Sequence, residues 1–245
     1  MVAVLLWGCG AVGVEERDDR LIAAFDDAGR AATARAGLGG GPTRVVERTA
    51  GLDEWREHAE AVVAGPFVVR PPWVAPRAGQ EHLVDLVIDP GHSFGSGSHP
   101  STRLALVLLA EAAIPGMTVL DVGCGSGVLS IAATRLGAVV RALDTDPDAV
   151  VTTRRNAAAN GVADRITVLE GEAATAAGPA ELVTANLTVD VHEHVASAVV
   201  ELADPRVVLV SGILDHQAPR AVAAYGGREV DRRVDGEWVG LVLDL

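Results

Sequence analysis

The sequence predicts an α/β fold, a doubly wound, mostly parallel seven-stranded sheet with a small α+β segment before it. From residue 81 onward, short apolar runs rich in β-branched residues alternate with helical stretches, which is typical of a parallel sheet covered by helices on both faces. The last two runs, 228–234 and 237–245, flank Asp235-Gly236, a strong hairpin signal. The sheet should therefore end in an antiparallel pair.

Five further runs are the candidate parallel strands of this sheet. They lie at 117–123, 139–144, 165–171, 181–187 and 206–212. One connecting helix should run from Gly127 to Gly137, where a glycine ends it. The next should begin at Asp146-Pro147, a cap followed by a first-turn proline, and end at Gly161. Both helices then connect neighbouring strands in the order that a doubly wound sheet requires.

The chain should divide into three parts. Residues 1–50 hold the candidate strands GVEE, LIAAF and TRVVERT and an Ala-rich helix at 28–38, a small α+β domain with part of a ferredoxin-like pattern. Residues 51–80 contain four prolines and are predicted to be a stiff connector. Residues 81–245 form the large domain. The first part is too short to hold much core by itself.

Composition and charge exclude several classes of function. All 20 cationic side chains are Arg, which excludes a Schiff-base lysine and a phosphate-loop lysine. The formal net charge of −13 disfavours direct nucleic-acid binding, which needs a basic face, and suits a basic protein partner. No apolar run approaches the ~20 residues that span a bilayer, so no membrane partner is expected. Cys9 and Cys124 lack metal-ligand spacing, so we expect no metal site and a cytoplasmic location.

The glycine turn DVGCGSG at 121–127 indicates a nucleoside site. It follows the first strand of the sheet and opens a helix, and Asp144 ends the second strand, where an acid can bind both ribose hydroxyls. The pattern is G-x-G-x-G rather than the G-x-G-x-x-G of pyrophosphate binding, which favours S-adenosylmethionine. A rival G-x-G-x-x-G begins at Gly8, but the charged VEERDDR after it favours a strand over a nucleotide-binding helix.

A second motif, DPGHSFGSGSHPST at 89–102, leads into a helix that opens at Pro100. Four further segments accompany it: DVGCGSGVLSIAATRLGA, DTDPDAV, TANL and VSGILDHQ. Together these segments resemble the ribosomal protein L11 methyltransferases, a family that modifies lysines and the amino terminus of that protein. The resemblance covers residues 53–245. It implies a class I, Rossmann-like methyltransferase that uses S-adenosyl-L-methionine in the cytoplasm, with the basic protein L11 as acceptor, and we expect a monomer.

The resemblance also implies a set of site residues. The family's cofactor contacts fall on Thr102, Gly123, Asp144 and Asn186. Gly125 of the same turn is a further cofactor-binding candidate, and Glu172 is one by its position after the third strand, where it could accept from the adenine amino group. Thr102 lies in the first turn of its helix, where a hydroxyl and free backbone N–H groups can hold a carboxylate. Asn186 ends the fourth strand beside the expected methyl group, and we predict that it is catalytic and orients the acceptor amine.

Some assignments stay open at the level of sequence. His99 is either a general base or a residue that shapes the loop beside Pro100. His192 and His194 are two residues apart and point to different helix faces, so they make a poor metal pair. GAVGVEE matches a position inside the family's amino-terminal recognition domain, so this domain is either shortened here or begins upstream of Met1. The alternative function is a class I methyltransferase that acts on another protein or a small molecule.

Overall fold

The computed structural model of the protein describes residues 13–17, 20–24, 28–38, 59–76, 78–90, 95, 97–175 and 179–245. The chain divides into two compact units, Met1–Trp55 and Arg56–Leu245. In the first unit, β1 (Gly13–Arg17) and β2 (Arg20–Ala24) pair antiparallel, and α2 (Ala28–Gly37) follows them. The strand at Gly13 confirms the prediction that GVEE is a strand and not the start of a nucleotide-binding helix. The strand predicted at 43–49 lies outside the described residues.

The second unit is built on a seven-stranded sheet, as predicted. Its strands in chain order are β6 (Thr118–Val122), β7 (Val139–Asp144), β8 (Ile166–Glu170), β9 (Leu182–Asn186), β10 (Val207–Leu214), β11 (Arg228–Asp235) and β12 (Trp238–Asp244). They are arranged in the order β11-β12-β10-β9-β6-β7-β8. The five strands from β10 to β8 are parallel, whereas β12 is antiparallel to both β10 and β11. The hairpin predicted at Asp235-Gly236 therefore closes one edge of a doubly wound sheet.

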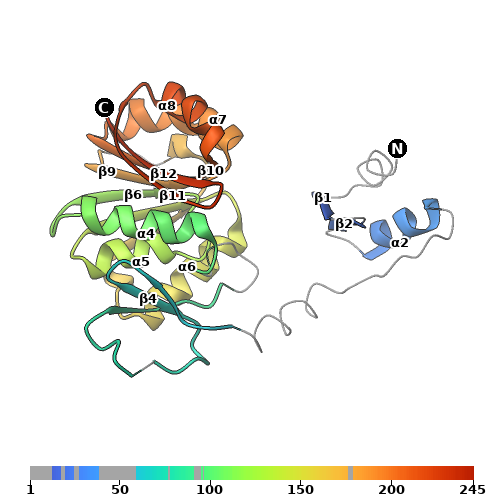
Figure 1. Ribbon diagram of the computed structural model, residues 1–245, viewed down its shortest axis with the longest axis horizontal. Coiled ribbons are helices and arrows are strands. Elements are labelled where there is room, and N and C mark those ends of the chain that lie inside the picture. The colour runs from blue at the N-terminus through green and yellow to red at the C-terminus, as the bar shows by residue number, and fades with distance from the viewer. Residues whose placement is uncertain are drawn as a thin grey trace. The chain divides into compact units, whose positions relative to one another are not determined.

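Helices cover both faces of this sheet (Figure 1). On one face lie α4 (Pro100–Ala112), α5 (Val128–Arg135) and α6 (Pro147–Ala159), and on the other α7 (Val189–Ala203) and α8 (Ala218–Tyr225). Successive strand residues feed the two cores, because Val119 packs with the first group and Leu120 with the second. Within the described part of the chain, none of the helices combines the length and the apolar character needed to cross a bilayer.

Helices α4 and α6 begin where the sequence predicts. Pro100 occupies the first turn of α4, and the side chain of His99 caps it by accepting from the Ser101 N–H. In the same way, Asp146 caps α6 by accepting from the Asp148 N–H at 2.9 Å. The described residues of this unit also contain three short 3₁₀ turns: η1 (Ala163–Arg165), η2 (Ala173–Thr175) and η3 (Asp215–Gln217).

A small second sheet has two of its three strands within the stretch for which prolines predict a connector. Its strands are β3 (Val62–Ala64), β4 (Phe67–Arg70) and β5 (Val84–Val87), with β3 antiparallel and β5 parallel to β4. This is a departure from the connector predicted at 51–80. Its physical reason is burial, since Phe67, Val69 and Leu86 join the core of α4 and α5. The small sheet thus packs against α4 and α5 and shares their hydrophobic core.

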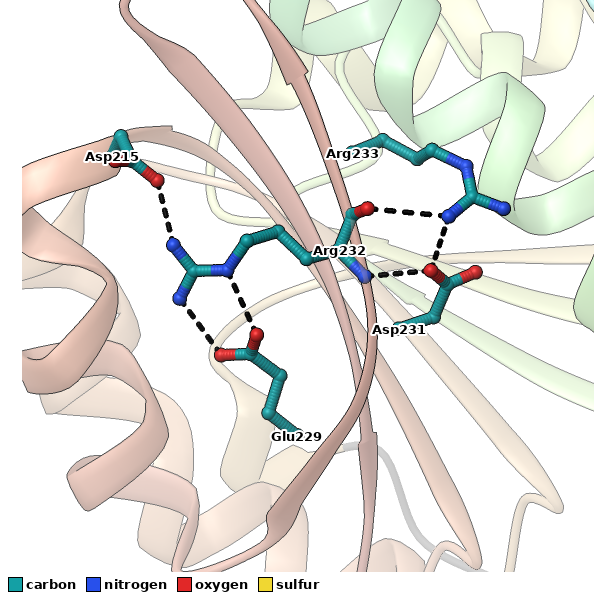
Figure 2. A network of polar contacts seen from close by, with 5 residues as sticks. All are labelled: Asp215, Glu229, Asp231, Arg232 and Arg233. Carbon is teal, nitrogen blue, oxygen red and sulfur yellow. Dashed lines mark hydrogen bonds and ion pairs between the residues drawn. The ribbon is translucent and has the colours of Figure 1, made fainter.

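The outer strand β11 carries a network of arginines and carboxylates (Figure 2). Arg232 donates two hydrogen bonds to Glu229, at 2.8 and 2.9 Å, and a third to Asp215 at 2.7 Å. The neighbouring Arg233 pairs with Asp231. Because the two Arg232–Glu229 bonds are parallel, the pair has the bidentate geometry that fixes a guanidinium in place. The network joins β11 to η3 at the end of β10.

Candidate active site

A cavity of about 830 Å³ opens at the carboxyl ends of the central parallel strands. Gly123 and Gly125 after β6, Asp144 at the end of β7, Glu172 after β8 and Asn186 at the end of β9 all line it. The strand order reverses beside β6, because β7 and β8 lie on one side of it and β9 and β10 on the other, and ligands of doubly wound folds bind at such a switch point. The structure therefore brings five of the six predicted site residues around one cavity.

The glycine turn between β6 and α5 has a backbone that only glycine allows at two positions. Gly123 has a φ of 72°, and a Cβ there would lie 2.3 Å from Leu187 Cδ2. Gly127 has a φ of 81°, and a Cβ there would lie 2.8 Å from Thr153 Cγ2. The positive φ disfavours a side chain at both positions, and at Gly127 the Thr153 backbone, 3.2 Å from such a Cβ, adds a steric limit. The turn presents bare backbone to the cavity.

Asp144 holds this turn and keeps acceptor capacity toward the cavity. Its Oδ2 accepts from the Gly125 N–H at 2.9 Å, and its Oδ1 accepts from the Asp146 N–H at 3.0 Å. A carboxylate has about four acceptor positions, so each oxygen retains one. Asp144 lines the cavity and is only partly buried. Its carboxylate has the capacity to accept from a pair of vicinal hydroxyls.

Asn186 presents an unsatisfied acceptor at the cavity. Its Nδ2 donates to Thr102 Oγ1 at 3.3 Å, which fixes the amide plane. Its Oδ1 is buried and has no hydrogen-bond partner among the described residues. A buried oxygen without a partner costs about 1–3 kcal/mol, a cost that a bound donor would remove. This oxygen is therefore an unpartnered acceptor on a residue that lines the cavity, and an N–H or O–H group of a ligand that reaches it would satisfy it.

Thr102 lies behind the cavity wall rather than in it. Its side chain is fully buried in the first turn of α4 and is not among the residues that line the cavity. Its hydroxyl accepts from Asn186, and its N–H donates to the His99 carbonyl at 3.1 Å. The free backbone N–H expected at this residue is thus already used. A direct contact between Thr102 and a cofactor stays a prediction, and the observed contact holds Asn186.

His99 and Trp238 form an aromatic corner of the same cavity. Both line it, and their rings meet edge to face with centroids 4.5 Å apart. His99 Nδ1 accepts from the Ser101 N–H, and burial, aided by the charge of Arg103, lowers the pKa of His99. The imidazole is therefore neutral at pH 7, and one of its nitrogens is occupied by the helix cap. These contacts favour the interpretation of His99 as a residue that shapes the loop.

The sequence of the chain matches one protein family over most of its length. The model of the family described as ribosomal protein L11 methyltransferase (PrmA) matches residues 42–244. The chain belongs to this family. The resemblance seen in the motifs is thereby confirmed.

Individual relatives agree with this assignment. A ribosomal protein L11 methyltransferase of Thermus thermophilus is 42% identical over 194 residues, covering 77% of this chain and 74% of the relative. One of Pelotomaculum thermopropionicum is 41% identical over 210 residues, covering 83% and 68%. The crystal structure of the ribosomal protein L11 methylase of Lactobacillus delbrueckii subsp. bulgaricus superposes with a TM-score of 0.66 at 29% identity, covering 76% of this chain and 98% of that one.

As a member of the L11 methyltransferase family, the chain is an S-adenosylmethionine-dependent methyltransferase, and its cavity fits that cofactor. The bare glycine turn leaves room for close approach at Gly123. Asp144 has free acceptor positions for the ribose hydroxyls, and the acid Glu172 lies beyond it in the same cavity. These residues lie where a bound cofactor would be, and their individual contacts with it stay predictions.

Several residues of the site are not predicted from sequence. Among them, Ser101, Gly212 and Trp238 line the cavity with the predicted residues. Gly212 has a φ of 82°, and a Cβ there would lie 2.5 Å from the Leu187 carbonyl oxygen and 2.9 Å from Asn186 Oδ1. A signal for Trp238 was present, because this rare aromatic residue follows directly on the Asp-Gly hairpin. Ser101 and Gly212 lie within the motifs HPST and VSGILDHQ, but contacts between distant segments place them at the cavity.

A buried carboxyl, Asp121, supports the glycine turn from inside the fold. It is 2% exposed, and it accepts from Ser130 Oγ at 2.5 Å and from Thr184 Oγ1 at 2.9 Å. These bonds tie β6 to α5 and to β9. Burial raises the pKa of Asp121 to about 6, against the opposing effect of the two hydroxyls. The ionised form is therefore penalised in the folded protein.

Asp121→Asn is expected to stabilise the protein more at high pH than at low pH. The unfolded carboxyl has a pKa of 3.8, so between pH 4 and 6 the folded state keeps a proton that the unfolded state has lost. Stability therefore falls as pH rises through this window, and stays lower above it. The variant removes the penalty, so its gain in unfolding free energy should be roughly 1 kcal/mol larger at pH 8 than at pH 5.

Urea unfolding of both proteins at the two pH values, followed by circular dichroism, measures this difference. Asp148→Asn is the matched control, because Asp148 is exposed at the start of α6. It should give the same unfolding free energy relative to wild type at both pH values. A gain for Asp121→Asn that is independent of pH would contradict the assignment of a raised pKa.

Proposed function

We propose that this protein transfers methyl groups from S-adenosylmethionine to lysine side chains and the amino-terminal amine of ribosomal protein L11 in the cytoplasm. Family membership supports the acceptor, because the relatives from Thermus thermophilus and Pelotomaculum thermopropionicum carry that name. The net charge of −13 suits a basic protein substrate. The observation that carries the proposal is the buried Asn186 Oδ1, an acceptor without a partner on a residue that lines the same cavity as the glycine turn and Asp144.

An amine must lose a proton before it can accept a methyl group. A lysine has a reference pKa of ~10.4, so the neutral form at pH ~7 lies about 4.6 kcal/mol above the ammonium. Burial in the cavity lowers the pKa of the amine, and so does the positive sulfonium of the bound cofactor, which supplies an activated methyl group. The reaction therefore needs an enclosed and well-oriented site more than it needs a strong base.

The residues of this chain can supply that orientation. Asn186 Oδ1 would accept an N–H of the neutral amine and so direct its lone pair along the line of displacement. The Thr102 hydroxyl holds the Asn186 amide in the required rotation. Trp238 and Leu187 give the cavity apolar walls that exclude water around the amine. No covalent intermediate with the enzyme is involved.

Transfer of tritium from labelled S-adenosylmethionine to purified L11 tests the proposal. Wild type and Asp144→Ala are compared side by side, and L11 with chemically acetylated amines is the control substrate. We expect label in untreated L11 with wild type only. Acetylated L11 should take up none, because its amines are blocked.

The other outcomes are equally informative. Cofactor binding without transfer to L11 would refute this acceptor and leave the alternative, another protein or a small molecule. Label in acetylated L11 would refute amine methylation. A wild-type protein that binds no cofactor would overturn the proposal as a whole.

The recognition of the acceptor is assigned in this proposal to residues 1–50. Their described parts form a hairpin of β1 and β2 with the helix α2, in a unit that is separate from the one with the cavity. The family match begins at residue 42, so most of this segment lies before it. Residues 1–50 are therefore the part of the chain in which acceptor preference can differ from that of the matched relatives.

A further inference from the structure

A fully buried histidine lies one layer behind the cavity. His192 sits on α7 with its side chain at 0% exposure, and it is not among the residues that line the cavity. Its Nε2 is 2.9 Å from the Ser211 carbonyl oxygen, and its Nδ1 is 3.0 Å from the Tyr225 hydroxyl. A carbonyl oxygen can only accept, so Nε2 carries the proton and Nδ1 accepts from Tyr225. The two contacts select one tautomer of a neutral ring.

The protonation state agrees with this geometry. Burial lowers the pKa of His192, although the backbone of Ser211 and of Leu187 opposes the effect. Tyr225, on α8, is itself buried, and its ring meets the His192 ring edge to face at 5.8 Å. The imidazole is therefore held from both sides as a fixed hydrogen-bond donor to Ser211.

Ser211 is the point at which three parts of the site meet. It lies in β10 where the pairing with β12 is interrupted by a bulge between Val210 and Ile213. Its carbonyl oxygen accepts from the Leu187 N–H at 3.0 Å as well as from His192. Its hydroxyl donates to the Ser101 carbonyl at 2.9 Å. The bulge is thereby tied to α7, to the residue after Asn186 and to the first turn of α4.

The same ties fix the backbone that carries Asn186. On one side the Leu187 N–H is bound to Ser211, and on the other the Asn186 side chain reaches Thr102, the residue after Ser101. Gly212 fills the space between, and no larger residue fits there because its Cβ would contact Asn186 Oδ1 at 2.9 Å. A shift of Ser211 would consequently move the acceptor oxygen of Asn186 in the cavity.

We propose that His192 is a positioning residue for methyl transfer, which acts through the Ser211 carbonyl on the turn that carries Asn186. The inference rests on the proposed role of Asn186 in orienting the acceptor amine. Tyr225 supports it by keeping the proton on Nε2. A displacement of about 1 Å at a reacting centre costs on the order of 100-fold in rate, so a bond one layer away can control turnover.

Three variants separate positioning from simple stability. His192→Leu removes both ring nitrogens, whereas His192→Gln places an amide N–H where Nε2 lies and can still donate to Ser211. Tyr225→Phe removes only the hydroxyl that selects the tautomer. We expect His192→Leu to lower kcat roughly 10-fold or more with the Kd for S-adenosylmethionine within threefold of wild type. His192→Gln should recover most of kcat, and Tyr225→Phe should fall between them.

A spectroscopic readout makes the test independent of the acceptor. The resonance of the Asn186 side-chain amide, observed by nitrogen-15 NMR in the cofactor-bound enzyme, should shift in His192→Leu and return to its wild-type position in His192→Gln.

If wild type transfers no label to L11 while this signal follows the variants, the proposed function fails and the positioning role stands. If wild type transfers label and His192→Leu leaves kcat and the signal unchanged, the positioning role is refuted. Equal losses of kcat in the Leu and Gln variants would refute it too. Should His192→Leu not fold, Tyr225→Phe and His192→Gln carry the same comparison.

Discussion

Asn186→Ala is expected to lower kcat for methyl transfer by about 100-fold while leaving the Kd for S-adenosylmethionine within about threefold of wild type. The reason is that Asn186 Oδ1 is a buried acceptor without a partner, so the bond that it can make is to the acceptor amine and not to the fold. Single-turnover transfer measures the first quantity, and calorimetric titration with the cofactor measures the second.

Thr102→Ser is the matched control for this prediction. It keeps the hydroxyl that accepts from Asn186 Nδ2, so the amide stays oriented and kcat should stay close to wild type. A loss of cofactor affinity as large as the loss of kcat in Asn186→Ala would show that Asn186 serves the cofactor. The orienting role would then be refuted.

Asp144→Ala is expected to weaken cofactor binding by roughly 100-fold. Two hydrogen bonds from ribose hydroxyls to a carboxylate contribute roughly 1.5 kcal/mol each, which together correspond to about 150-fold in Kd. The substitution also removes the acceptors for the Gly125 and Asp146 N–H groups, which loosens the glycine turn. Equilibrium binding of labelled S-adenosylmethionine measures the change.

Asp148→Ala is the control, because Asp148 lies four residues further on, is exposed and does not line the cavity. It changes the net charge by the same amount, so its Kd should stay within twofold of wild type. If Asp144→Ala binds the cofactor as tightly as Asp148→Ala, the assignment of Asp144 to the cofactor-binding site is refuted.

The large sheet could be predicted because its strands carry their signal locally. Strands β6, β9 and β10 are short apolar runs that are mostly buried on both faces, and all five parallel strands begin and end within two residues of the predicted bounds. The hairpin of β11 and β12 follows from two residues, Asp235 and Gly236. Asp144 and the glycine turn were equally predictable, since strand ends of a parallel sheet meet at one edge.

The remaining parts depend on contacts that the local sequence does not contain. Strands β3 and β4 have three and four residues, too few for a period to be recognised, and burial against α4 and α5 defines them. The family resemblance assigns Thr102 to the cofactor site, but its hydrogen-bond partner Asn186 is 84 residues away in the sequence. The bond between His192 and Ser211 links a helix to a bulge that has no sequence pattern of its own.

The arginine network on β11 also protects the free edge of the sheet against pairing with a further strand. This strand is the outer one of the seven, and within the described residues no further strand pairs with its free edge. Its Val230 and Val234 are 47% and 55% exposed, so an unprotected β11 would offer an extended template to another chain. The Arg232 N–H already donates to the Asp231 carboxylate, and the Arg232 carbonyl accepts from the Arg233 guanidinium, so an incoming strand would have to displace both side chains to pair with this residue (Figure 2). The charged pairs therefore act as gatekeepers against aggregation through strand addition, in a protein whose core is largely alanine, valine and leucine.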